Sequence, residues 1–502
     1  MNENKKKISV SYIIVLLAAA VLYIVSCAPG PLWQDSGMIQ YRVWHNDIEG
    51  GLGLALSHPL FFILAIGAKY IPLGEFAHRV NLVSAIAAAV AVANLFLLLR
   101  LWLGRNLPAI IAAVTFALSH TFWRHACIAE TYTLYIAILI AELIMLLQYV
   151  KTNRVGYLYL LGLFNGLSIA DHMFGSIPLL CYAIFLIVLL ARRGIRLRHL
   201  AGIILFWVIG AGLYEYLIIK NIIRTGDFTG TLASAIFGTG WQGAVLNISL
   251  SVKIVKENLL FLLFNFPTPN ILLFFAGCFG LFKLSPRRDF KNVLLGIMVL
   301  FLIFAFRYTV PDRYAFFIPF YCILSIFIGL GAHLLQMRIN HKVFAYLTLL
   351  FSLLPIPVYL AVPTLADKMR FSLGIRREIP YRNSYTYFLQ PWKTGYHGAE
   401  LFASKALESA ENEAIIIADG TTVYALWYLQ GVKGINTKVK VVSQHGNYKN
   451  PIPFPTMDTI EQLMADDTVY VVSPVEGYCP DYLLKHYDFI KTGPIYRVVA
   501  RQ

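Results

Sequence analysis

Side chains that could move a proton beside a charged phosphate recur in the polar segments between long apolar runs of this sequence. A carboxylate can act as a general base toward a hydroxyl group. Arginine and histidine can neutralise a phosphate leaving group through charge-assisted hydrogen bonds. Together they suit the transfer of a sugar from a lipid-linked phosphosugar. The candidate residues are Asp35, His58, His120, Arg124, His125, Glu130, Asp171, His172, Asp312 and Arg313.

The patterns of several other reaction centres are missing from the sequence. It has no Ser-His-Asp spacing, no H-E-x-x-H and no Asp-x-Asp pair, which disfavours proteolysis and transfer from soluble nucleotide sugars. The tail from about residue 363 has neither G-x-G-x-x-G nor a P-loop, so it is assigned no nucleotide site, and no soluble cofactor is expected. None of the six cysteines forms a C-x-x-C pair, which argues against a zinc site. No metal ligands are assigned, although Asp35 and Glu130 could share a divalent ion and metal dependence stays open.

The composition indicates what must position these residues. Of 502 residues, 58% are hydrophobic and only 14% are charged, against about 45–50% and about 25% in soluble domains. This excludes an ordinary cytosolic enzyme, a disordered chain and a fibrous one, and it predicts a polytopic helical membrane protein. The net charge of +15 is then expected to mark cytoplasmic loops, not nucleic-acid binding.

Eleven apolar runs are candidate membrane spans, which need about 20 mostly apolar residues each. Two of them, 107–123 and 156–171, are short and weak. If the further run 56–72 crossed as well, most Lys and Arg of the later short loops would fall outside, against the positive-inside rule. We therefore expect 56–72 to lie along the outer membrane face, with the amino terminus cytoplasmic and the first span an uncleaved anchor. The expected spans are 8–28, 80–101, 107–123, 127–149, 156–171, 174–191, 199–220, 259–282, 292–307, 314–336 and 343–362.

The tail after residue 362 differs in composition from the rest. Short β-rich runs at 414–418, 439–442, 469–472 and 496–499 alternate with helical patterns at 399–410, 422–429, 459–464 and 481–486. This alternation predicts a small α/β domain. The expected organisation is a transmembrane domain over 1–362 with its first outer loop at 29–79, a connecting segment over 363–397, and an extracytoplasmic α/β domain over 398–502.

Five motifs in order resemble one family. They are Asp35-Ser36-Gly37, Ser57-His58-Pro59, Arg79-Val80-Asn81-Leu82, Thr121-Phe122-Trp123 leading to Ala129-Glu130-Thr131-Tyr132-Thr133-Leu134, and Gly166-Leu167-Ser168 leading to His172. The sequence is similar to bacterial membrane proteins related to protein O-mannosyltransferases, within the GT-C superfamily of lipid-phosphate-sugar glycosyltransferases. The likeness covers residues 30–180 well and the stretch 381–393 more loosely. Asp171 departs from the pattern, which has a small or amide residue before the histidine.

The resemblance implies a GT-C fold in the bacterial inner membrane. It maps the catalytic base onto Asp35 and a second catalytic acid onto Glu130, and leaves the other candidates for substrate binding. The implied partners are a polyprenyl-phosphate sugar as donor, a protein or glycan hydroxyl as acceptor, and membrane lipids. The sugar, the carrier, the acceptor and the oligomeric state stay undetermined.

Other interpretations of the same residues remain open. Asp35 could merely cap the following helix, His58 could serve a turn, and Asp312 with Arg313 could form a local salt bridge. A transporter or lipid flippase is the main alternative function, although transporters place ionisable groups near the bilayer midplane. A non-catalytic scaffold would leave Asp35, Arg124 and Glu130 scattered.

Overall fold

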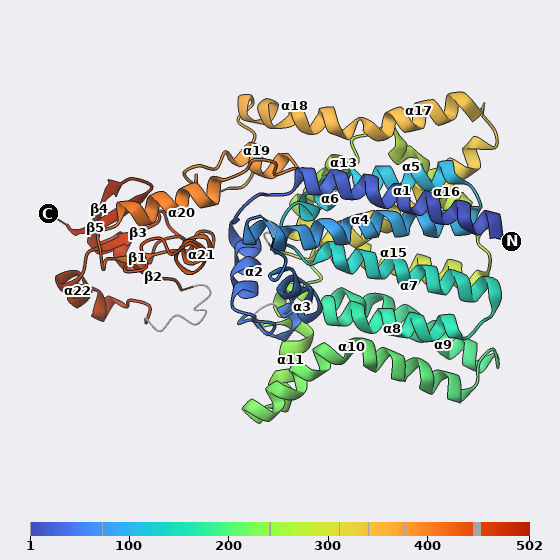
Figure 1. Ribbon diagram of the computed structural model, residues 1–502, viewed down its shortest axis with the longest axis horizontal. Coiled ribbons are helices and arrows are strands. Elements are labelled where there is room, and N and C mark those ends of the chain that lie inside the picture. The colour runs from blue at the N-terminus through green and yellow to red at the C-terminus, as the bar shows by residue number, and fades with distance from the viewer. Residues whose placement is uncertain are drawn as a thin grey trace.

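Apolar helices, whose backbone groups bond internally as lipid requires, form a bundle over most of the chain. The computed structural model describes residues 2–72, 74–239, 242–310, 312–339, 341–375, 377–444 and 453–501. A small α/β unit stands at one end of the bundle, and the amino terminus lies at the other (Figure 1). The long helices are α1 (Asn2–Ser26), α4 (Phe76–Leu103), α7 (Tyr132–Thr152), α8 (Gly156–Asp171), α9 (Ser176–Ala191), α10 (Leu197–Thr225), α15 (Arg288–Arg307) and α16 (Ile318–Gln336).

The remaining bundle helices are shorter or come in pairs. They are α5 (Asn106–Ala117) and α6 (His120–Ala126), α11 (Phe228–Phe237), α12 (Gln242–Val245), α13 (Val252–Asn265) and α14 (Leu273–Leu284), and α17 (His341–Leu353) and α18 (Pro355–Lys368). Within the described residues, eight helical segments are long and apolar enough to cross a membrane, or up to ten if each bent pair is one span. The expected span 156–171 coincides with α8, which has only 16 residues.

Two expected straight spans are wrong in detail, because the chain bends within them. The expected span 259–282 is broken between α13 and α14 by 114°. Pro267 and Pro269 lie at this break, and Thr268 between them is extended. A proline lacks the N–H group that a continuing helix needs, and it drives the preceding residue out of the helical region. The expected span 107–123 is likewise bent by 71° between α5 and α6, where Ser119 is extended.

The first outer loop folds into two short helices, α2 (Gln34–Trp44) and α3 (Pro59–Ala68). With 10 residues, α3 is about 15 Å long, half the hydrocarbon thickness of about 30 Å. It is therefore too short to cross, and its position along the membrane face stays a prediction. Helix α2 lies crosswise to the long helices, at the end of the bundle next to the α/β unit (Figure 1). We call this the α2 end.

The α/β unit contains a five-stranded sheet of order β2-β1-β3-β5-β4. Strands β2, β1 and β3 are parallel, and β5 runs antiparallel to both β3 and β4. The four strands expected from the sequence are present, whereas β4 had not been expected. The elements are α20 (Gly398–Ser409), β1 (Ile415–Ile417), α21 (Val423–Lys433), β2 (Lys440–Val442), α22 (Met457–Asp466), β3 (Val469–Val471), α23 (Asp481–His486), β4 (Tyr487–Thr492) and β5 (Ile495–Ala500).

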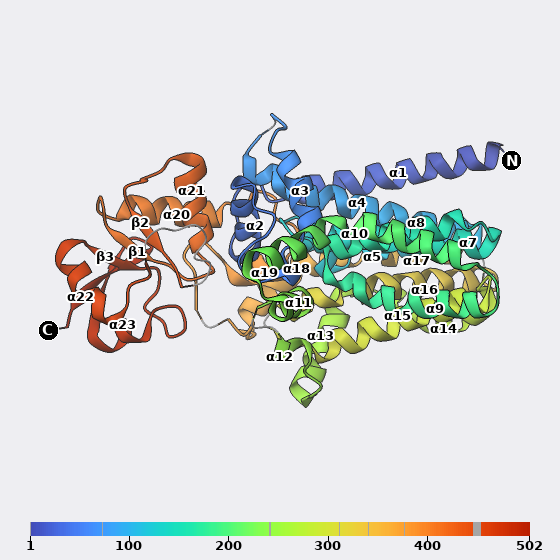
Figure 2. The ribbon, with the colours of Figure 1, turned by 90° about the horizontal axis from the view of Figure 1, so that it is seen from below.

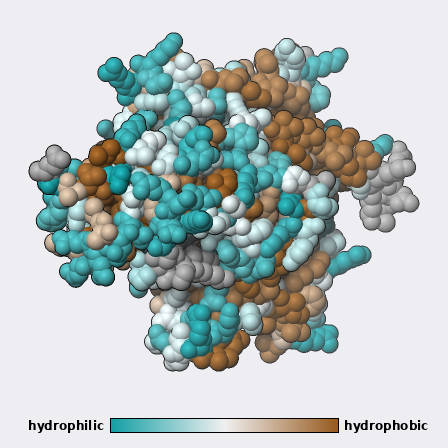
Figure 3. All heavy atoms as spheres, turned by 60° about the vertical axis from the view of Figure 1, so that its left-hand side comes forward, coloured by the Kyte–Doolittle hydropathy of each residue, from teal (hydrophilic) through white to brown (hydrophobic). Residues whose placement is uncertain are grey.

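The helices of this unit cover both faces of the sheet. Helices α20 and α21 pack on one face, and α22 and α23 on the other. Figure 2 shows the unit as a separate lobe beyond the α2 end, joined to the bundle by the segment that carries α19 (Ser384–Leu389). The surface of the lobe is largely hydrophilic, whereas hydrophobic residues predominate on the helices behind it (Figure 3).

An apolar core shared with the first outer loop fixes the lobe on the bundle. Trp33 packs against Phe402 of α20 with ring centroids 5.5 Å apart, and Tyr41 lies 5.4 Å from Trp427 of α21. All four rings belong to one cluster of packed side chains. The lobe therefore buries part of the face of α2 and holds that helix in place.

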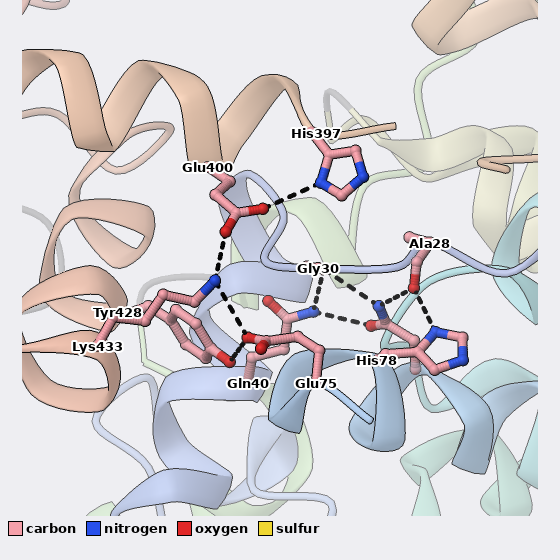
Figure 4. A network of polar contacts seen from close by, with 10 residues as sticks. Ala28, Gly30, Gln40, Glu75, His78, His397, Glu400, Tyr428 and Lys433 are labelled. Atoms are coloured by element: carbon pink, nitrogen blue, oxygen red, sulfur yellow. Dashed lines mark hydrogen bonds and ion pairs between the residues drawn. The ribbon is translucent and has the colours of Figure 1, made fainter. Parts of the chain in front are cut away.

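A polar network adds to this contact (Figure 4). Tyr428 of α21 donates a 2.6 Å hydrogen bond to Glu75 and accepts one of 3.0 Å from the amide of Ala77 at the start of α4. Lys433 lies between Glu400 and Glu75, forming ion pairs with both. Hydrogen bonds and an ion pair thus connect the lobe to the start of α4.

Candidate functional site

Three carboxylates from distant parts of the chain gather at the α2 end. Asp35 lies in the first turn of α2, Glu130 in the break between α6 and α7, and Asp312 just before the short helix Arg313–Phe317. The hydroxyl of Ser36 donates a 3.4 Å hydrogen bond to Glu130. Ser84 of α4 fixes the Glu130 backbone, accepting from its amide and donating to its carbonyl. Elements that are separate in sequence thus hold the carboxylates near one another.

The backbone around Asp35 is held from both sides. The preceding residue, Gln34, has a φ of 52°, an uncommon value for a residue with a side chain, and its amide donates to the carbonyl of Thr421 in the lobe. Such backbone outliers cluster at functional sites. The cap position of α2 is Trp33, and no side chain caps this helix. The structure therefore does not support a capping role for Asp35.

The protein environment and the neighbouring negative charges give Asp35 and Glu130 different pKa values. Water reaches Asp35, whose side chain is exposed, yet the surrounding protein and the charge of Asp312 raise its pKa to about 6. Burial and the charges of Asp35 and Asp312 raise the pKa of Glu130 well above its ordinary value, although Arg124 opposes this rise. At neutral pH, Asp35 is therefore mostly ionised, while Glu130 holds its proton more tightly than an ordinary glutamic acid. Neighbouring acids with such different pKa values can serve as base and proton donor.

Three buried cations form a second group beside the carboxylates. Arg124 of α6, Arg382 and Lys393 are 5%, 6% and 3% exposed. The guanidinium groups of both arginines lie over the ring of Phe388, at 5.2 and 5.1 Å from its centroid. Lys393 lies 5.3 Å from the ring centroid of Tyr387. Aromatic rings of α19 thus contact all three basic side chains.

These cations have no protein counter-ion among the described residues. Arg124 donates a hydrogen bond to the hydroxyl of Tyr314, and Lys393 donates to the carbonyl of Gln390. Neither arginine has a partner for its Nε, and no ion pair of the described chain includes any of the three. Buried charges are normally paired. The group is therefore suited to an anion that a ligand brings.

Histidines line the side of the site toward α7 and α8. The rings of His58 and His172 lie 4.8 Å apart, and His172 lies 5.3 Å from Tyr132. The ring of His125 lies 5.2 Å from the same tyrosine ring. Burial lowers the pKa of His58 to about 4, so this ring is neutral at physiological pH. Its Nδ1 donates a 2.7 Å hydrogen bond to the carbonyl of Asp171.

The other three candidates lie away from the carboxylates or are engaged elsewhere. The Asp171 carboxylate is fully buried, and neither of its oxygens has a hydrogen-bond partner. His120 packs against Phe264 of α13, with ring centroids 4.5 Å apart. Arg313 forms an ion pair with Glu257 of α13 and not with the adjacent Asp312, so the local salt bridge considered as an alternative is absent.

The sequence analysis missed two of the cations, Arg382 and Lys393, and the aromatic residues Tyr314 and Tyr387 that contact the cationic group. The only signal for the first two was the loose resemblance over 381–393. They lie more than 200 residues beyond Arg124, in a segment otherwise interpreted as a connection. Their role could not be inferred without knowing that this segment folds back onto α6.

The comparisons with known proteins agree with this architecture. Residues 55–194 match a family model described as the N-terminal domain of the protein O-mannosyl-transferase TMEM260. The fold is similar to ArnT from Cupriavidus metallidurans, both bound to undecaprenyl phosphate (TM-score 0.60, 16% identity) and in the apo state (0.59, 15%), each over 98% of both chains. It is also similar to the apo oligosaccharyltransferase of Archaeoglobus fulgidus (0.50, 14%), over 92% of this chain and 69% of the other. No curated protein sequence matches the chain. The resemblance inferred from the sequence and the GT-C-like fold are thereby confirmed.

Proposed function

We infer that this multi-pass membrane protein is a glycosyltransferase that takes a sugar from a polyprenyl-phosphate carrier and passes it to a hydroxyl of a protein or glycan on the extracytoplasmic side. Two findings about similar proteins support this proposal. The matched family model is that of a protein O-mannosyl-transferase, and one structure of similar fold is bound to undecaprenyl phosphate. The first finding favours a mannosyltransferase-like activity, and the second favours a polyprenyl-phosphate donor.

One observation carries the proposal. A group of carboxylates stands beside a group of buried cations without counter-ions, and Arg124 joins the two groups because its charge acts on Glu130. The transfer needs both parts. A base must accept the proton of the acceptor hydroxyl, and positive charge must stabilise the phosphate that leaves.

The residues suggest the following sequence of bond changes. The acceptor oxygen attacks the anomeric carbon and gives its proton to the Asp35 carboxylate. The bond between that carbon and the phosphate oxygen breaks, and the polyprenyl phosphate departs with the electron pair. Arg124, Arg382 and Lys393 hold the phosphate, and a protonated Glu130 can donate a hydrogen bond to it or to the sugar. Attack from the face opposite the leaving group inverts the anomeric configuration.

The distribution of charge supports the assignment of sides. Basic loops meet at the end of the bundle that is opposite to α2. There Arg287 donates a 2.9 Å hydrogen bond to Asn153 and, like Arg192, forms an ion pair with Asp289. Because cytoplasmic loops are enriched in Lys and Arg, we assign this end to the cytoplasm. The site and the lobe are then extracytoplasmic.

The test is the Asp35→Asn variant, assayed in detergent with a labelled polyprenyl-phosphate sugar and an envelope fraction as acceptor. Loss of a general base lowers turnover by about 10²–10⁴-fold. Asp367→Asn, which changes an exposed carboxylate of α18, is the matched control and should retain full activity. Wild-type turnover by a folded Asp35→Asn variant would exclude Asp35 as the base.

The alternative of a transporter or flippase finds less support. A continuous path through the bilayer lined by Glu142 and Glu215 would favour transport. Instead, Glu142 is fully buried and accepts hydrogen bonds from Ser168 and Asn165 of the adjacent α8. Its contacts are those of a polar link between two packed helices.

A further inference from the structure

A pocket lies in the lobe, outside the site discussed above. It has a volume of about 680 Å³, within the range of about 300–1,000 Å³ that is usual for small-molecule sites. Its lining comes from the segments that follow β1 and β3 and from α23. None of the residues assigned above to proton transfer or phosphate binding lines it.

The topology of the sheet explains why a pocket forms at this place. Strand β1 lies between β2 and β3, and the helices that follow β1 and β3, α21 and α23, cover opposite faces of the sheet. The chain therefore leaves β1 and β3 in opposite directions and opens a crevice at their carboxyl ends. Open α/β sheets bind their ligands in such a crevice. Ala418 and Asp419, directly after β1, and Gly477 to Asp481, after β3, line this one.

The lining combines aromatic rings with a few polar groups of both signs. Tyr478 and Tyr482 provide ring faces, while Asp419, Asp481 and Lys485 provide hydrogen-bonding groups. Positive and negative side chains nearly balance here, unlike in the cationic group beside Arg124. Apolar ring faces suit the C–H faces of a sugar ring, and carboxylate and ammonium groups suit its hydroxyls. A phosphate or nucleotide would favour a concentration of positive charge.

One wall of the pocket is rigid before any ligand binds. Arg377 forms a buried ion pair with Asp419, and its guanidinium lies 4.2 Å from the ring centroid of Tyr478. The other carboxylate oxygen of Asp419 accepts a 2.7 Å hydrogen bond from the amide of Thr421. A fixed carboxylate beside a fixed ring reduces the ordering that binding requires.

The same loop connects the pocket with the proposed catalytic base. The carbonyl of Thr421 accepts a 3.1 Å hydrogen bond from the amide of Gln34, the residue before Asp35. Only Gly420 separates Asp419 from Thr421, so bond lengths limit the distance between the Cα atoms of Asp419 and Asp35 to about 18 Å. A short oligosaccharide in the pocket could therefore extend toward the Asp35 carboxylate.

We propose that the crevice at the carboxyl ends of β1 and β3 is a binding site for a neutral oligosaccharide, which is the acceptor or the glycan attached to it. The identification as an acceptor site rests on the proposed function. The binding itself does not, because it depends on residues of the lobe alone. The two can therefore be tested separately.

The test measures binding of a panel of neutral oligosaccharides to the full-length protein in detergent, with acidic oligosaccharides and unglycosylated Ser/Thr peptides in parallel. At least one neutral oligosaccharide should bind, and Asp481→Asn or Tyr478→Leu should raise its Kd at least tenfold. Asp488→Asn, which changes an exposed carboxylate of β4 that does not line the pocket, should leave the Kd unchanged.

Three results would overturn the proposal. They are the absence of binding by any neutral oligosaccharide, binding that the two pocket variants leave unchanged, and a preference for the peptides or acidic sugars. The proposed function fails by a different result, which is unchanged sugar transfer by Asp35→Asn. If the pocket variants bind the oligosaccharide weakly but transfer sugar at the wild-type rate, the crevice is a binding site but not the acceptor site.

Discussion

Replacing Asp312 by asparagine tests the electrostatic account of the base. Partial desolvation by the surrounding protein and the Asp312 charge raise the pKa of Asp35 to about 6, so about nine-tenths of the protein carries an ionised Asp35 at pH 7 and about one-tenth at pH 5. Because only the ionised form accepts a proton, kcat/KM should rise with pH and reach half its maximum near pH 6. Asp312→Asn removes a negative charge that disfavours ionisation. The half-maximum should therefore move to lower pH.

The expected shift has a limit that the structure sets. Desolvation by the surrounding protein is the larger cause of the raised pKa and is unchanged in the variant, so the pKa of Asp35 should stay above its ordinary value of 3.8. The assay follows release of labelled sugar from the lipid carrier between pH 4.5 and 8. Asp367→Asn is the control, because this exposed carboxylate of α18 contributes nothing to the pKa of Asp35. An Asp312→Asn profile that coincides with the wild type, or moves to higher pH, would refute the reasoning.

Three further predictions concern the anion site, the helix packing and the attachment of the lobe. Arg124→Gln should lower kcat by about 10²–10³-fold, and steady-state kinetics showing wild-type turnover would contradict its role at the phosphate. Gly166→Ala should lower the free energy of unfolding by about 1–3 kcal/mol, since the added carbon would lie 2.2 Å from the carbonyl oxygen of Trp207. Gly212→Ala is the control, because its added carbon would meet no atom within 4 Å. Equal unfolding temperatures of the two variants in detergent would argue against close packing of α8 on α10. Tyr428→Phe removes a hydrogen bond to each of two groups of the bundle and should destabilise by about 1–3 kcal/mol, with limited proteolysis revealing whether the lobe loosens.

The sequence predicted the candidate carboxylates better than the cations. Asp35 and Glu130 stand next to apolar runs and inside ordered motifs, and both features can be observed along the chain. Arg382 and Lys393 stand in a segment that is not distinctive by itself. They gain their importance from contacts with Phe388 and Tyr387, which bring them beside Arg124. The opposite holds for Arg313. Its place in the sequence suggested substrate binding, but in the structure it forms an ion pair with Glu257.

The sequence by itself determined the membrane class, the approximate spans and the α/β character of the tail. These properties depend on hydropathy and periodicity over one segment at a time, and each segment must satisfy its own backbone in lipid or in a sheet. Even there, the two bends and strand β4 were missed, because local sequence only weakly distinguishes a broken helix or an edge strand from its alternatives.

Only the tertiary structure decided which charges meet. It placed the lobe on α2, brought residues near 35, 130 and 312 together and opened a crevice at the carboxyl ends of β1 and β3. Each of these depends on packing between segments that are far apart along the chain. Burial and neighbouring charges then set the pKa values that separate Asp35 from Glu130. A carboxylate has the same intrinsic acidity wherever it stands in a sequence, and only its surroundings make it a base.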